Sequence, residues 1–244
     1  ATGPDGPIVS PMSTTVTAPT QAGSRTRLLS WPVIAWGLWD WGSAAFNAVI
    51  TTFVFTVYLV SDSFGAKADN ESALSLGLAI AGLFIALLAP VTGQRSDRGG
   101  RTVFWLGGYT AVVVAVSAAL FLVRPEPGYL WFGIVLLGVG NIFFELASVN
   151  YNAILNHLAP KDRIGAVSGL GWGMGYLGGI VLLLILYVAL VGPSPLVSFA
   201  AGSGMGVRVA MLVSAAWFGL SALPVLINRS RSSGRSHTED DAEV

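Results

Sequence analysis

The sequence predicts an all-α membrane protein with six transmembrane helices, and three observations lead to this fold class. Hydrophobic residues make up 53% of the 244 residues, whereas charged residues make up only 11%, less than half of the roughly 25% usual in soluble domains. The charges cluster, and long uncharged stretches separate the clusters. Basic residues gather in alternate connections between these stretches. A soluble fold is excluded, because so few charges could not cover its surface.

Six stretches with at most one charge are long enough to cross a hydrocarbon core of about 30 Å as helices. Their predicted ranges are 32–60, 72–94, 102–123, 129–156, 164–191 and 209–227. An open strand could not satisfy its backbone in lipid, so helices are expected. Polar composition predicts disordered cytoplasmic tails over residues 1–30 and 229–244, on either side of a transmembrane domain over 31–228.

The basic residues predict the orientation of the chain. Six spans place both termini on one side, and most basic residues fall there: Arg25, Arg27, Arg95, Arg98, Arg101, Lys161, Arg163, Arg229, Arg231 and Arg235, against Lys67, Arg124 and Arg208 on the other. Positive charge marks the cytoplasmic side. We therefore expect a multi-pass protein of the cytoplasmic membrane with both termini in the cytoplasm. Trp31, Trp36, Trp39 and Trp41 are interpreted as an aromatic belt at the membrane interface.

Two acidic residues lie inside predicted helices, where a lipid-facing carboxylate costs roughly 2.5–3.5 kcal/mol. The polar residues beside them repeat the spacing i, i+3 and i+7: Asp40, Ser43 and Asn47 form the first stripe, and Glu145, Ser148 and Asn152 form the second stripe. At 100° per residue each stripe falls on one helical face. Thr51 extends the first stripe, and Asn141 and Asn156 extend the second.

Two such stripes three helices apart are expected to line one central pathway in a 3+3 inverted repeat. A carboxyl in a poorly solvated cavity, without a cationic partner, can carry a proton or bind the ammonium group of a solute. The six stripe residues are therefore predicted to bind substrate or protons. Two alternatives stay open: Asp40 as an interfacial carboxylate near the lipid headgroups, and Glu145 as a structural hydrogen-bonding group between helices.

Glycines form two rows in the fifth predicted helix, each with a spacing of four residues. One row is Gly165, Gly169 and Gly173, and the other is Gly171, Gly175 and Gly179. Small residues at this spacing let helix backbones approach closely. One row is expected to pack inside the six-helix unit, and the second indicates another close neighbour outside it.

The residues offer little for metal, nucleotide or triad chemistry. Cysteine is absent, and the histidines, His157 and His237, lie at a helix end and in the C-terminal tail. The dinucleotide-like glycines of 173–178 lie in an apolar helix that no strand precedes, and the sequon Asn70-Glu-Ser72 is interpreted as a chance match. A net charge of zero gives no indication of a nucleic-acid partner. We expect no enzyme activity, no cofactor and no metal.

The connection between the second and third predicted helices reads Gly93-Gln-Arg-Ser-Asp97-Arg98-Gly-Gly100-Arg101-Thr102. Its glycines allow a tight turn, and its arginines hold that turn in the cytoplasm. The segment resembles the G-x-x-x-D-R-x-G-R loop of the major facilitator superfamily, at the same place between helices. The connection Ala159-Pro-Lys-Asp-Arg163-Ile-Gly165 is similar to that superfamily's P-x-x-R-G-type turn, with Ile164 interrupting the motif.

Two helix segments, 36–47 and 168–179, resemble one branch of the superfamily. This is the "unknown major facilitator" branch, related to fungal vacuolar amino-acid effluxers, and the resemblance spans residues 31–227. It implies a secondary transporter that moves small solutes such as amino acids by alternating access. Because the sequence contains no nucleotide-hydrolysing motif, we expect a proton gradient or the solute's own gradient to drive it. It also implies that the first and fourth helices line the cavity and that a cytoplasmic gate is formed by Gly93, Asp97, Arg98, Gly100 and Arg101.

The superfamily has twelve helices in two halves, whereas this sequence predicts six. Three interpretations stay open. The chain is the N-terminal half of a longer transporter, or it pairs with a separate half or a second copy of itself, or it is a six-helix scaffold or assembly protein that transports nothing. The expected partners are the lipid bilayer, a small solute with or without protons, and a second six-helix half.

Overall fold

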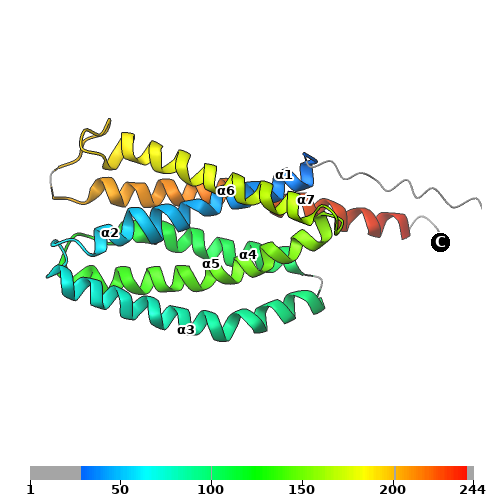
Figure 1. Ribbon diagram of the computed structural model, residues 1–244, viewed down its shortest axis with the longest axis horizontal. Coiled ribbons are helices and arrows are strands. Elements are labelled where there is room, and N and C mark those ends of the chain that lie inside the picture. Colours follow the sequence, from blue (N-terminus) through cyan, green and yellow to red (C-terminus); the bar gives the residue numbers. More distant parts are fainter. Residues whose placement is uncertain (1–28, 100, 201, 241–244) are drawn as a thin grey trace, which may run out of the picture.

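The computed structural model describes residues 29–99, 101–200 and 202–240, with the backbone alone for 94–99 and 228–240. Six helices in this part of the chain are long and apolar enough to cross a membrane (Figure 1). They span Trp31–Leu59, Lys67–Gly93, Thr102–Leu122, Pro127–Leu158, Ile164–Val191 and Met205–Ile227. Each lies within a few residues of its predicted range. The predicted all-α fold class with six spans is confirmed.

The first span is interrupted, whereas most of the others are regular. It consists of α1 (Trp31–Ala44), a π-helical segment (Ala45–Phe53) and α2 (Phe55–Leu59). The other helices are α3 (Lys67–Gly99), α4 (Thr102–Ala119), α5 (Leu130–Leu158), α6 (Ile164–Leu186), which a π-helical segment extends over Tyr187–Val191, and α7 (Met205–Asp240). Short 3₁₀ turns, Leu120–Leu122 and Pro127–Tyr129, flank the connection from α4 to α5. Helix α7 continues beyond residue 228, where we expected the transmembrane domain to end.

The helices pack in a pattern that repeats between the two halves of the bundle. Helix α1 contacts α6 and α7, α5 contacts α3 and α4, and α4 contacts α7. Exchanging the first three spans with the last three leaves this pattern unchanged. Spans three apart run in opposite directions, so this is the arrangement of a 3+3 inverted repeat. The start of α1 and the end of α7 lie at the same end of the bundle (Figure 1).

Aromatic side chains fill the centre of the bundle, where α1, α5 and α7 meet. Phe144 of α5 stacks on Phe46 with ring centroids 5.1 Å apart, and Phe218 of α7 packs edge-on against Trp39 at 5.5 Å. Each of these side chains is less than 5% exposed. Aromatic pairs of this kind stabilise by about 0.5–1.5 kcal/mol beyond the area they bury. These four rings therefore form a buried aromatic cluster on the helices that carry the stripes.

The predicted aromatic belt is wrong for two of its four members. Trp36 and Trp39 are each only 1% exposed, because their spacing of three residues turns both toward α5. Trp41 is half-buried and stacks on Trp217 of α7 with ring centroids 5.8 Å apart. Trp31 alone is exposed, at 57%. These tryptophans therefore serve mainly to pack α1 against its neighbours.

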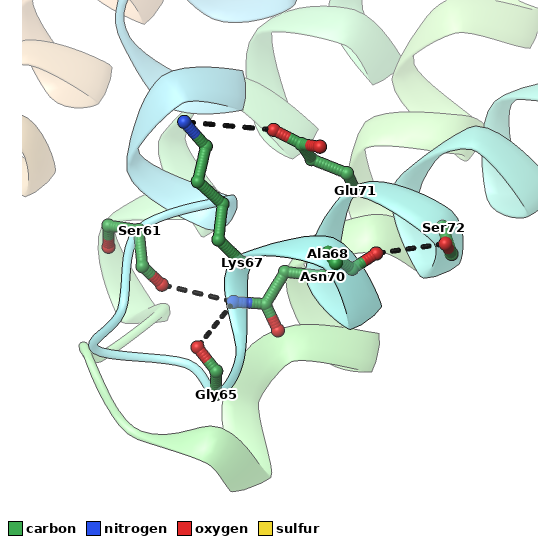
Figure 2. A network of polar contacts seen from close by, with 7 residues as sticks. All are labelled: Ser61, Gly65, Lys67, Ala68, Asn70, Glu71 and Ser72. Carbon is green, nitrogen blue, oxygen red and sulfur yellow. Dashed lines mark hydrogen bonds and ion pairs between the residues drawn. The ribbon is translucent and has the colours of Figure 1, made fainter.

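A polar network closes the connection from α2 to α3 (Figure 2). The Asn70 amide donates to the backbone oxygens of Ser61, at 3.0 Å, and Gly65, at 3.2 Å. Gly65 has φ +138°, which only glycine adopts without strain. Lys67 and Glu71 form an exposed ion pair at 3.8 Å. Because Asn70 is 1% exposed and holds the turn, its side chain is inaccessible to glycosylation, in agreement with the chance-match interpretation of the sequon.

Candidate functional site

One cavity of about 530 Å³ lies where α1, α5 and α6 face one another. All six stripe residues line it: Asp40, Ser43, Asn47, Glu145, Ser148 and Asn152. The first stripe contributes one wall and the second stripe another, although more than ninety residues of sequence separate the two. Helix α6 supplies a third wall, which includes Trp172, Gly175 and Tyr176. The structure therefore brings the two stripes together at one site.

Asp40 is held in place by its neighbours. The Ser43 hydroxyl donates to Asp40 Oδ1 at 3.2 Å and to the Asp40 backbone oxygen at 3.0 Å. The other carboxyl oxygen, Oδ2, rests against α6, where a Cβ added at Gly175 would lie 2.7 Å away. Any larger residue at Gly175 would displace the carboxyl. Asp40 is half-buried and lines the cavity.

Glu145 differs from Asp40 because its carboxyl makes no hydrogen bond or ion pair with the residues that the structure describes. Its side chain is exposed to the cavity from the middle of α5. Two turns further along, the Asn152 amide donates to the Ser148 backbone oxygen at 2.9 Å. The interpretation of Glu145 as a structural hydrogen-bonding group has no support among the described residues.

The π-helical segment changes which threonine follows the first stripe. Thr51 and Thr52 both donate to the Asn47 backbone oxygen, at 2.7 and 2.8 Å, but Thr52 lines the cavity and Thr51 does not. A π-turn accommodates more residues than the 3.6 of an α-turn, which moves the inward position from i+4 to i+5. The predicted extension of the stripe to Thr51 is therefore wrong by one residue. Of the predicted extensions of the second stripe, Asn141 is half-buried, Asn156 is exposed, and neither lines the cavity.

Tyr151 is a cavity residue that the stripe pattern missed. Its ring lies between Trp36 and Trp39, with centroids 4.4 Å from each. The side chain is 4% exposed, and its hydroxyl has no hydrogen-bond partner among the described residues. Buried hydroxyls almost always have a partner. The only sequence signal for this position was a large aromatic residue beside two asparagines.

The two glycine rows of α6 face different surroundings. The row Gly171, Gly175 and Gly179 lies against α1, where added Cβ atoms would meet Trp36, Asp40 and Ala44. Added Cβ atoms at Gly165, Gly169 and Gly173 would meet nothing within 4 Å. The row Gly171, Gly175 and Gly179 lets α6 approach α1 closely, so that α6 forms one wall of the cavity. The second row leaves one face of α6 open, and a neighbour for it stays a prediction.

Comparison with known proteins identifies the family. The profile of the Major Facilitator Superfamily matches residues 8–183, well over half of the chain. The chain belongs to the Major Facilitator Superfamily. The MFS-type transporter YxiO of Bacillus subtilis (strain 168), itself uncharacterised, is 30% identical over 200 residues, which cover 79% of this chain and 45% of YxiO. The chain thus spans about half the length of that relative. No solved structure matches the chain.

Superfamily membership and six spans make the chain a multi-pass integral membrane protein with half of a major facilitator fold. The superfamily consists of transporters and not of enzymes, as the sequence led us to expect. The finer resemblance to one branch, with amino acids as substrates, stays a prediction. Within the half-fold, α1 and α5 are the first and fourth spans, which the resemblance implied would line the cavity.

The superfamily loop differs from the predicted turn. Helix α3 continues to Gly99 and α4 begins at Thr102, so the expectation of a turn from Gly93 onward was wrong. Basic residues in the last turns of a helix are favoured by its dipole, which accounts for the longer helix. The Arg101 guanidinium lies 4.6 Å from the centroid of the Phe104 ring. Gly100 and the side chains of Asp97 and Arg98 lie outside the described residues, and a gate role for this segment stays a prediction.

Proposed function

We propose that this chain moves a small solute across the membrane by alternating access, as the N-terminal six-helix half of a secondary transporter. The single observation that carries the proposal is the shared cavity, which both stripes line. A half-fold built as an inverted repeat presents such a site near its centre, and rocking against a second half would expose it to either side in turn. Nothing in the sequence indicates nucleotide hydrolysis, so an ion or solute gradient is the proposed driving force.

The two carboxyls have separate roles in this proposal. Glu145, which has no partner among the described residues, binds the solute or carries the coupling proton. Asp40, held by Ser43 and by the surface of α6 at Gly175, shapes the site and contributes a second negative charge. Acidic residues inside membrane spans commonly mark substrate or proton pathways, which supports this assignment. Ser43, Asn47, Ser148 and Asn152 provide further polar contacts.

The proposed transporter also needs a second six-helix half and a cytoplasmic gate. The second six-helix half lies in the same polypeptide, in a separate chain or in a second copy of this chain, and the partial coverage of YxiO supports the need for it. Gly93, Asp97, Arg98, Gly100 and Arg101 form the cytoplasmic gate. Both termini lie in the cytoplasm, and a polar tail precedes and another follows the membrane domain in the sequence. The resemblance to the amino-acid effluxer branch favours amino acids as one solute class.

Counterflow in proteoliposomes tests the proposal. The protein and its matching half would be reconstituted with an internal excess of unlabelled amino acids or amines, and entry of the radiolabelled form would be measured. Transient accumulation that Glu145→Gln abolishes and Glu126→Gln spares would support transport through the cavity. Glu126 is a suitable control because it is exposed and lies in a connection outside the cavity. Accumulation that is equal with and without protein would favour a non-transporting scaffold instead.

A further inference from the structure

We propose that the cavity selects organic cations, with the ammonium group of the solute between the carboxyls of α1 and α5 and the aromatic rings of α6. The inference rests on the proposed transport function and narrows the solute from amino acids and amines to organic cations that carry no carboxylate. Three features of the cavity lead to it: its charge, its exposed rings and a buried hydroxyl without a partner.

The charge of the cavity wall has one sign. Among the described residues that line it, Asp40 and Glu145 are acidic, and none is Lys, Arg or His. An anion would be repelled by both carboxylates, and the carboxylate of a zwitterion would find no counter-charge on these walls. Asp40 already accepts a hydrogen bond from Ser43, whereas Glu145 has no such partner among the described residues. Glu145 is therefore the counter-ion that a cation would meet first.

Aromatic rings with accessible faces lie on the α6 wall of the same cavity. Trp172 and Tyr176 are one turn apart, with ring centroids 6.1 Å apart at an angle of 59°. They are 62% and 67% exposed, unlike Trp39 and Tyr151, whose faces are covered by stacking. Cations bind over such faces within about 6 Å of the ring centroid. Acidic groups together with accessible aromatic faces form a recognition surface for ammonium groups.

The Tyr151 hydroxyl is a separate sign of a missing ligand. It is buried, it lines the cavity and it has no partner among the described residues. An added Cβ at Gly171 would lie 3.1 Å from this hydroxyl, and one at Gly175 would lie 2.7 Å from Asp40 Oδ2. Gly171 and Gly175 are neighbours on one face of α6, where such positions are about 5–6 Å apart. A primary ammonium group between them could donate one N–H to the Tyr151 oxygen and another to Asp40.

A set of four ligands that share one skeleton tests the charge preference. They are 2-phenylethylammonium (a cation), phenylalanine (a zwitterion), 3-phenylpropionate (an anion) and 2-phenylethanol (neutral). Binding to the purified chain in lipid nanodiscs would be measured by calorimetry. We expect 2-phenylethylammonium to bind at least about tenfold more tightly than each of the others. Equal or tighter binding of phenylalanine or 3-phenylpropionate, or no difference among the four, would overturn the inference.

Substitutions at Glu145 and Tyr151 test whether these side chains cause the preference for the cation. Glu145→Gln should remove the advantage of 2-phenylethylammonium, whereas Glu126→Gln should leave it unchanged. Tyr151→Phe should weaken 2-phenylethylammonium but not its N-trimethyl derivative, which has no N–H to donate. If the Glu145→Gln variant retains the full preference for 2-phenylethylammonium, this cation does not bind in the cavity.

Failure of this inference can be told apart from failure of the proposed function. Counterflow of phenylalanine in preference to 2-phenylethylammonium, sensitive to Glu145→Gln, would retain transport and reject cation selectivity. Tight binding of 2-phenylethylammonium without any counterflow would retain the selectivity and reject transport.

Discussion

Asp40 and Glu145 stand at equivalent places in the two repeats, yet their surroundings differ. Both begin an i, i+3, i+7 stripe and both line the same cavity. On the α1 side, Ser43 donates to the Asp40 carboxyl, and the helix widens into a π-segment directly afterwards. On the α5 side, the helix stays regular over Leu130–Leu158, and Glu145 has no partner among the described residues. The repeated pattern therefore produces one fixed carboxyl and one available carboxyl.

A repeated stripe therefore determines the position of each carboxyl but not its role. Position follows from helical spacing, which is the same in both spans. Role depends on what the opposite helix presents: Gly175 lets α6 press against Asp40, whereas no described group holds Glu145. An ionised group without a partner is the one that a ligand or a proton can use.

Substitution should affect transport far more at Glu145 than at Asp40. Glu145→Gln should reduce counterflow by at least about thirtyfold, since loss of one charge from a desolvated pair costs roughly 2 kcal/mol or more. Asp40→Asn should reduce it only a few-fold, because an amide oxygen can still accept the hydrogen bond from Ser43. The measurement is the initial counterflow rate in proteoliposomes. The reverse order of the two variants would show that the fixed carboxyl is the functional one.

A second expected effect concerns the helix that presses on Asp40. Gly175→Ala should lower the free energy of unfolding by about 1–3 kcal/mol, because its Cβ would collide with the Asp40 carboxyl. Gly173→Ala is the matched control, since nothing lies within 4 Å of its added Cβ and alanine favours the helix by up to about 1 kcal/mol. Thermal unfolding in detergent would compare them. Equal melting temperatures would show that α6 does not press on Asp40.

Ser43 and Ser148 should differ in their contribution to stability, because only Ser43 donates a hydrogen bond to a carboxyl among the described residues. Ser43→Ala removes the hydrogen bond to the Asp40 carboxyl and should cost about 0.5–1.5 kcal/mol of stability. Ser148→Ala, at the matching place of the second stripe, should be close to neutral, because no described carboxyl accepts from its hydroxyl. Denaturation in a mixed-micelle system would compare the two variants. A larger loss for Ser148→Ala would reverse the assignment of fixed and available carboxyls.

Two neighbouring threonines test whether the π-helical segment is present. Thr51→Val and Thr52→Val each remove one hydrogen bond to the Asn47 oxygen, so their stabilities should be similar. Only Thr52 lines the cavity, so only Thr52→Val should weaken solute binding, by up to about fivefold. Calorimetric titration of both variants checks this difference. A stronger effect of Thr51→Val would indicate that the span is a regular α-helix at this position.

Much of the fold could be predicted because lipid imposes simple rules on length and charge. The stripes could be placed on one face wherever the helix is regular, as it is from Glu145 to Asn152. The same rule gave the wrong threonine after Asn47, because the sequence carries no evident signal for the π-segment. The belt interpretation failed for Trp36 and Trp39 because an interfacial and a buried tryptophan look alike in sequence.

The rest of the site depends on contacts between distant helices. Tyr151 could not be recognised as a cavity residue, because its burial depends on the stacking of Trp36 and Trp39 from another helix against its ring. The two glycine rows of α6 look equivalent in sequence, and only the position of α1 distinguishes Gly171 from Gly169. The length of α3 was underestimated because the glycines of the superfamily loop were interpreted as the beginning of a turn.

Cysteine labelling can determine whether both stripes line one cavity. The sequence contains no cysteine, so each introduced thiol can be followed alone. Asn47→Cys and Asn152→Cys, one from each stripe, should react with a water-soluble cationic methanethiosulfonate, and 2-phenylethylammonium should protect both. Thr51→Cys should react slowly, and the added ligand should not protect it. Protection of only one stripe, or equal reaction at Thr51→Cys, would contradict the shared cavity.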